Sequence, residues 1–132
     1  MFRENIEWYK SEGASDFELA KLQKLVKFEL PQAYIELLRF SNGGEGSLSV
    51  QPLYFVLDSV QSAISYFESE ASKALPGYFI FGGNGGGELL AIEQKTGSVV
   101  SIDSCNFNVE EIVIVASSFS KFLELVQCKS KA

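Results

Sequence analysis

Five acidic residues in the second half of the chain are the side chains best suited to chemistry. They are Glu88, Glu93, Asp103, Glu110 and Glu111. Two carboxyl groups held about 5 to 10 Å apart can act as acid and base on a glycosidic bond. No spacing in the sequence singles out one pair, and acidic neighbours arise by chance in a chain with this many carboxylates. We therefore interpret the five first as a solvated acidic surface, and only last as the site of a small carboxylate-dependent hydrolase.

The composition removes several classes of enzyme. The chain has no histidine, so it lacks a Ser-His-Asp or Cys-His site in its usual form and the commonest transition-metal ligand. Cys105 and Cys128 are too few for a four-thiolate zinc site. We expect a protein that is not an enzyme, with no catalytic residue, no cofactor and no metal, and we interpret both cysteines as free thiols.

Residues 82–87 form a glycine cluster, Gly-Gly-Asn-Gly-Gly-Gly. Consecutive backbone amides of this kind can bind a phosphate. A phosphate loop also needs a Gly-Lys-Ser/Thr motif and a following helix, whereas Glu88 and a strand-like run come next here. The cluster therefore predicts a hairpin turn.

Charge is unevenly distributed along this acidic chain. The net charge is −6 over 132 residues, yet residues 41–120 contain nine acidic residues and only Lys73 and Lys95 as bases, a net charge of −7. So few cations cannot supply the phosphate contacts on which nucleic-acid binding depends, so we expect no direct binding to DNA or RNA. An acidic surface suits a basic protein partner, although the same excess also serves solubility alone.

The elements that must position these residues are helical towards both ends of the chain. Ser15 and Glu18 have the spacing of a capping box ahead of a helix over residues 16–27. A second helix is expected to start at Pro31 and to stop before Asn42-Gly43-Gly44. Two further helices are expected behind caps, one near residues 60–67 and one from Ser118.

The middle of the chain predicts strands, with a three-stranded antiparallel meander around the glycine turn. The expected strands are 47–50, 53–57, 78–81, 88–93 and 98–102, residues 73–77 are expected to be a loop, and 112–116 is either a strand or a buried connector. These elements favour an α+β fold in a single domain over residues 1–132. Its central sheet is mostly antiparallel, and the N-terminal helices, one inserted helix and a C-terminal helix pack on it.

No apolar run approaches the roughly 18 residues that a membrane span requires. The first seven residues are charged and lack the apolar core of a secretion signal. We therefore expect a cytoplasmic protein with no membrane partner.

Four motifs occur in a recognisable order. The first joins Leu30-Pro31-Gln32-Ala33-Tyr34 to Leu37-Leu38 and Asn42-Gly43-Gly44, and the others are Phe81 with the glycine cluster and Glu88, Ile92-Glu93 with Gly97-Ser98-Val99, and residues 118–123. Over about residues 30–126 this order resembles the SUKH superfamily, which includes the yeast cell-wall assembly regulator and many bacterial immunity proteins. The chain departs from the family pattern at Leu37, where an aromatic residue is common, and at Glu88, where aspartate is usual.

The resemblance implies a fold more than a site, because the shared residues end helices, form a turn or pack inside. The residues interpreted as structural are Pro31, Tyr34, Asn42, Gly43, Gly44, Gly85, Gly86, Gly87, Phe119 and Phe122.

For function, the resemblance implies a bacterial-type immunity protein. Such a protein binds a cognate toxin, commonly a nuclease, and blocks it stoichiometrically without turnover. A nuclease presents a basic groove, which agrees with the acidic segment 41–120. The expected partner-binding residues are Glu88, Glu93, Asp103, Glu110 and Glu111. The alternative is a regulatory or scaffold domain that binds an endogenous partner, as the yeast relative suggests.

Overall fold

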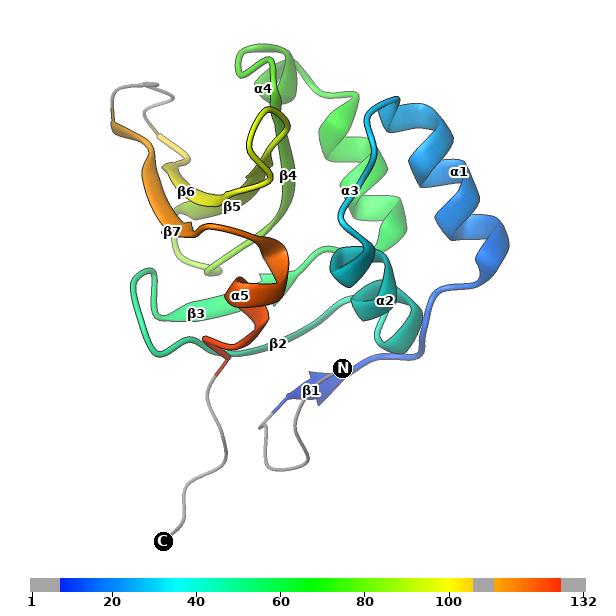
Figure 1. The fold of residues 1–132 in the computed structure, drawn as a ribbon, viewed down its shortest axis with the longest axis horizontal. Coiled ribbons are helices and arrows are strands. Elements are labelled where there is room, and N and C mark those ends of the chain that lie inside the picture. Colours follow the sequence, from blue (N-terminus) through cyan, green and yellow to red (C-terminus); the bar gives the residue numbers. More distant parts are fainter. Residues whose placement is uncertain (1–7, 106–110, 127–132) are drawn as a thin grey trace, which may run out of the picture.

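The computed structural model describes residues 8–105 and 111–126 of the chain. Within these ranges it is an α+β fold with one seven-stranded antiparallel sheet and five helices (Figure 1), which confirms the predicted fold class. The strands follow one another across the sheet in chain order. The strands are β1 (Tyr9–Lys10), β2 (Gly44–Ser47), β3 (Tyr54–Leu57), β4 (Tyr78–Gly83), β5 (Glu88–Glu93), β6 (Val99–Asp103) and β7 (Val113–Ala116). The helices are α1 (Asp16–Val26), α2 (Gln32–Phe40), α3 (Val60–Phe67), α4 (Glu70–Lys73) and α5 (Phe119–Leu123).

The start of α1 is fixed by the predicted capping box. The Ser15 hydroxyl accepts a hydrogen bond from the Glu18 amide at 3.2 Å, and the Glu18 carboxylate accepts one from the Ser15 amide at 3.0 Å. Each side chain thus accepts a hydrogen bond from a backbone amide that has no partner within the helix. Pro31 is the residue just before α2 rather than its first helical residue, and α2 ends at Phe40, ahead of Asn42 as expected.

The β2 strand lies earlier in the chain than predicted. The prediction of a strand over 47–50 is wrong, because pairing with β1 and β3 begins at Gly44 and ends at Ser47. Gly44 has φ +118°, and a Cβ atom there would lie 2.7 Å from the Tyr9 carbonyl oxygen. Only glycine allows β1 and β2 to approach this closely. The β3 strand confirms the one predicted over 53–57, one residue shorter.

Two short helices follow β3. The α3 helix is confirmed where it was predicted, with the Ser59 hydroxyl accepting from the Ser62 amide at 3.2 Å. The Asn42 side chain accepts from the Val60 amide at 2.7 Å, so Asn42, two residues after the end of α2, also satisfies the first turn of α3. The α4 helix was not predicted. It occupies Glu70–Lys73, and the loop expected over 73–77 begins one residue later.

The predicted meander of β4, β5 and β6 is confirmed, and 112–116 resolves into a strand rather than a buried connector. All pairs in the sheet are antiparallel. Both Val113 and Ile114 of β7 are more than half exposed, so this edge strand is only partly covered. In Figure 1, α5 lies between β7 and the β2–β3 hairpin, while α1, α2 and α3 lie together on the side of β4 away from β6 and β7.

The core is rich in aromatic rings and lies on the helix-covered face of the sheet. The Tyr34 ring meets Phe79, Phe81 and Phe119 edge-on, with ring centroids 5.4 to 5.9 Å apart. Edge-on ring pairs of this kind stabilise a fold beyond simple area burial. A second, smaller cluster packs on the opposite face of the sheet. Its buried members are Leu75, Ile80, Ala91, Val100 and Ile102.

The sheet narrows to a seam between β3 and β4. These strands pair at only two positions, Val56 with Gly83 and Leu57 with Gly82. One further backbone hydrogen bond, from the Asp58 amide to the Phe81 carbonyl at 3.0 Å, continues the ladder before the chain turns into α3. The seam therefore places Asp58 beside the glycine turn, where the candidate site lies.

Every helix in the described part of the chain falls short of the length and apolarity needed to cross a bilayer.

Candidate functional site

The glycine turn between β4 and β5 is held by one side chain. The Asn84 side-chain oxygen accepts hydrogen bonds from the amides of Gly86, at 2.9 Å, and Glu88, at 3.1 Å. The Asn84 amide donates to the Glu88 carbonyl at 3.0 Å, and its side-chain nitrogen donates to the Pro52 carbonyl at 3.4 Å. The hairpin predicted for residues 82–87 is confirmed, and it fixes Glu88 at the first position of β5.

Glu88 and Asp103 are direct cross-strand partners in β5 and β6. Residues paired in this way have Cβ atoms about 5 Å apart on the same face, and like charges so placed repel each other. Asp103 accepts a hydrogen bond from the Cys105 amide at 2.8 Å. The ion pairs formed within the described residues involve neither carboxylate. The sheet register therefore joins two of the five predicted acids into one negative cluster.

A small hollow, the acidic notch, adjoins this cluster at the seam. Its volume is about 280 Å³. Asp58, Glu88 and Tyr66 are among its lining residues, and much of the remaining wall is glycine backbone. The lining residues are Val56, Asp58, Tyr66, Gly82, Gly83, Gly85, Gly86, Gly87, Glu88, Leu89 and Ser104.

Asp58 is the most perturbed acid of the notch. Burial raises its pKa from 3.8 to about 6, because a carboxylate loses hydration when it leaves water. Burial, followed by the negative charge of Asp58, also raises the pKa of both Tyr66 and Tyr34. The Tyr34 hydroxyl is fully buried and has no hydrogen-bond partner among the described residues. The notch thus contains a partly desolvated carboxylate near an unsatisfied phenol.

The other predicted acids lie elsewhere. Glu93 is at the far end of β5, about 17 Å along the strand from Glu88. Its carboxylate accepts hydrogen bonds from the Tyr78 hydroxyl, at 3.2 Å, and from the Thr96 hydroxyl, so it also fixes the β5–β6 turn. Glu111 is exposed just ahead of β7, and Glu110 lies outside the described residues. Their roles in partner binding remain predictions.

Residues shared with the SUKH motifs form the turn and the core around this site. Gly85 and Gly87 have positive φ angles, +76° and +120°, that favour glycine in the turn. Gly43 has φ +108° where the chain leaves α2. Phe119 and Phe122 of α5 are fully buried against the aromatic core. Of the shared residues, only the turn glycines line the notch.

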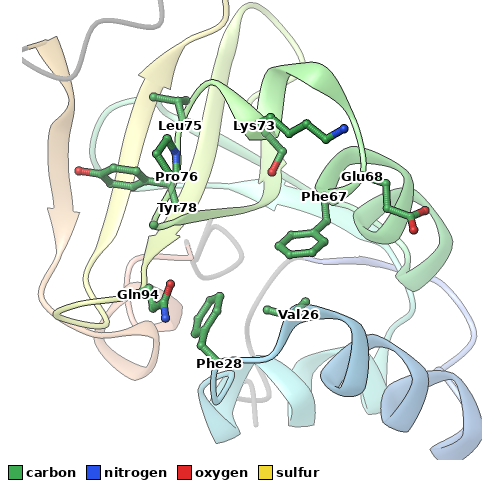
Figure 2. A pocket seen from close by; sticks show the side chains of 11 residues that line it. Val26, Phe28, Phe67, Glu68, Lys73, Leu75, Pro76, Tyr78 and Gln94 are labelled. Carbon is green, nitrogen blue, oxygen red and sulfur yellow. The ribbon is translucent and has the colours of Figure 1, made fainter.

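Figure 2 shows a second, larger hollow of about 640 Å³ between the end of α1, the α3–α4 segment and the β5–β6 turn. The rings of Phe28 and Phe67 project into it, whereas the Tyr78 ring points away. Lys73, on its rim, forms an ion pair with Glu70 at 3.5 Å. The hollow is walled mainly by apolar groups and holds no cluster of perturbed titratable groups.

Sequence reasoning missed Asp58 and Tyr66. Asp58 directly precedes the helix cap Ser59, so the sequence pattern assigned it to the start of a helix and not to a site. The usable signal was a carboxylate directly after the apolar strand Tyr54–Leu57, where the chain leaves a sheet. Cys105 is an exposed free thiol, while Cys128 lies outside the described residues. The described ranges contain no group of three residues suited to hold a metal ion.

The SMI1/KNR4 family model (SUKH-1) matches residues 13–125, which cover α1 to α5. The chain therefore belongs to the SMI1/KNR4 family, and the resemblance seen in the sequence is confirmed. A search of curated proteins finds no match.

Proposed function

We propose that the protein is an immunity protein that binds a basic toxin, a nuclease in the first instance, and neutralises it by stoichiometric binding. The observation that carries this proposal is the paired carboxylates of Glu88 and Asp103 beside the acidic notch. Membership of the SMI1/KNR4 family supports it, because many SUKH proteins are immunity proteins.

The acidic cluster destabilises the free protein. Like charges directly opposite each other in a sheet destabilise the pairing, and a half-buried carboxylate loses hydration. A cationic partner would relieve both effects on binding. A nuclease must attract a polyanion, so its active-site groove supplies the positive charge that this surface lacks.

A carboxylate-dependent hydrolase remains the least favoured function, because one small hollow of about 280 Å³ is all that Asp58 and Glu88 line together. Binding without turnover accounts for the same carboxylates. The competing function is a regulatory domain with an endogenous partner, as in the yeast relative.

The test is a co-expression rescue. Reading frames next to the gene are expressed under tight control in a sensitive bacterium, and growth is scored with and without this protein. We expect one neighbour to be toxic and this protein to restore growth. A toxic neighbour that the protein does not rescue, or the absence of any toxic neighbour, would favour the regulatory function instead.

Two double variants test whether rescue depends on the paired carboxylates of Glu88 and Asp103. E88K/D103K reverses the paired carboxylates, and E29K/E124K makes the same change in net charge at two exposed acids outside the notch. We expect the first double variant to lose rescue and the second to keep it. Equal behaviour of the two would contradict a role for the acidic cluster.

A further inference from the structure

Five glycines, Gly82, Gly83, Gly85, Gly86 and Gly87, line the acidic notch. A Cβ atom on Gly82 would lie 2.2 Å from the Val56 carbonyl oxygen, and one on Gly83 would lie 2.6 Å from the Glu88 carbonyl oxygen. At Gly87, φ is +120° and a Cβ would have no atom within 4 Å, so this part of the rim is open. Glycine backbone therefore forms part of the wall, and the rim is open at Gly87.

The groups around the hollow accept positive charge and hydrogen bonds. Asp58 and Glu88 line the hollow from different elements, and neither side chain forms a hydrogen bond or ion pair among the described residues. The fully buried Tyr34 hydroxyl has no hydrogen-bond partner among the described residues, and the negative charge of Asp58 adds to burial in raising its pKa, but Tyr34 is not among the lining residues of the notch. Tyr66 adds an aromatic ring to the wall. No lysine or arginine is among the described lining residues.

We propose that the acidic notch receives one arginine side chain of a basic protein partner. A guanidinium group donates hydrogen bonds in a planar fork, which suits carboxylates, and an aromatic wall can stack against it. It is also more weakly hydrated than an ammonium group, so it loses less hydration on entering a half-buried site. That this partner is a toxin rests on the proposed function, whereas the chemistry of the notch does not.

Binding should depend on pH in a defined direction. A guanidinium group favours ionised Asp58, whose pKa in the free protein is about 6, so affinity should fall as the pH is lowered through 6. The titratable groups around Asp58 are Tyr34 of α2, Tyr66 of α3 and Glu88 of β5. Neither tyrosine titrates in this range, because burial and the charge of Asp58 both raise its pKa.

The experiment uses the full chain and a short probe, acetyl-Gly-Arg-Gly-amide. Its matched control carries citrulline, which has nearly the shape of arginine without the charge. Amide NMR shifts are followed during titration at pH 7.5 and pH 5. We expect saturable shifts at residues 82–88 and 104 with the arginine peptide only, weaker at pH 5, and about tenfold weaker for D58N. The E29Q variant removes one acid outside the notch and should bind like wild type.

Several results would overturn the assignment. If the citrulline peptide caused the same shifts as the arginine peptide, the notch would not recognise positive charge. If a lysine peptide bound as tightly as the arginine peptide, the notch would have no preference for guanidinium. Shifts away from the notch, or equal weakening by D58N and E29Q, would show diffuse attraction to an acidic surface. Unchanged shifts elsewhere in the spectrum of D58N establish that this variant is folded. Peptide binding without rescue by co-expression would support the arginine site and refute the proposed function. Rescue without peptide binding would support the proposed function and refute the arginine site.

Discussion

Tyr34 combines favourable ring contacts with a hydroxyl that is buried and unsatisfied. Its ring lies within 6 Å, centroid to centroid, of Phe79, Phe81 and Phe119, whereas its hydroxyl has no partner among the described residues. Removing an unsatisfied buried polar group recovers its lost hydration energy. We therefore expect Y34F to raise the free energy of unfolding by about 1 kcal/mol, measured by urea denaturation.

The matched variant Y34A removes the ring as well as the hydroxyl, and it should lower the free energy of unfolding by about 3 to 5 kcal/mol. A loss of stability in Y34F comparable to that in Y34A would contradict the description of the hydroxyl as unsatisfied.

Asp58 gives the fold a pH dependence of known sign. Its pKa is about 6 in the folded chain and 3.8 as a free group, so the folded state binds more protons between these values. Protonation of Asp58 therefore raises the free energy of unfolding as the pH falls through 6, and the full increase is reached below 3.8. We expect D58N to be more stable than wild type at pH 7.5, with the difference shrinking by pH 4.5 in urea denaturation. The E29Q control should show little such change, and a constant difference for D58N would contradict burial as the cause.

At the scale of elements, the seam between β3 and β4 depends on one glycine. Gly82 pairs with Leu57, and a Cβ there would overlap the Val56 carbonyl oxygen at 2.2 Å. We expect G82A to lower the free energy of unfolding by about 3 kcal/mol or more. In the same turn, a Cβ on Gly86 has only an ordinary contact, 3.7 Å from the Asn84 side chain, so G86A should change stability by less than about 0.5 kcal/mol. Thermal unfolding of the two variants compares them directly, and equal losses would show that crowding at the seam is not the cause.

The sequence predicted those elements whose signals are local. The capping box of α1, the cap of α3 and the hairpin at Asn84 all depend on residues within four positions of each other. The β2 strand was misplaced because Gly-Glu-Gly-Ser has low strand propensity and is held in a strand by β1 and β3 on either side. The α4 helix has four residues, too few for a hydrophobic period to be recognised.

The candidate site could be predicted only in part for the same reason. Glu88 and Asp103 were selected by charge, but their pairing follows from the register of β5 and β6. Asp58 was missed because residues around it, such as Tyr66 of α3 and the turn glycines, are not its neighbours in sequence. A single sequence gives residue types, whereas a perturbed carboxylate is a property of its neighbours in space.

At the scale of the whole molecule, the excess negative charge should act on the rate of association. Electrostatic attraction between complementary surfaces speeds encounter and is screened by salt. Once a partner is identified by rescue, we expect E88K/D103K to slow its association about tenfold at low salt and to flatten the salt dependence. Stopped-flow measurements over a range of NaCl concentrations test this. If E29K/E124K slows association equally, net charge rather than the paired cluster controls the rate.

The chain-order arrangement of the strands bears on how such a protein can diversify. Because each strand pairs with its neighbours in the chain, a change in the length of a connecting turn leaves the identity of every pairing intact. The β4–β5 turn forms much of the notch and Ser104, just after β6, also lines it, so the proposed partner surface is built largely from segments that tolerate variation. Related chains could therefore differ in the length and sequence of their turns while keeping the same aromatic core.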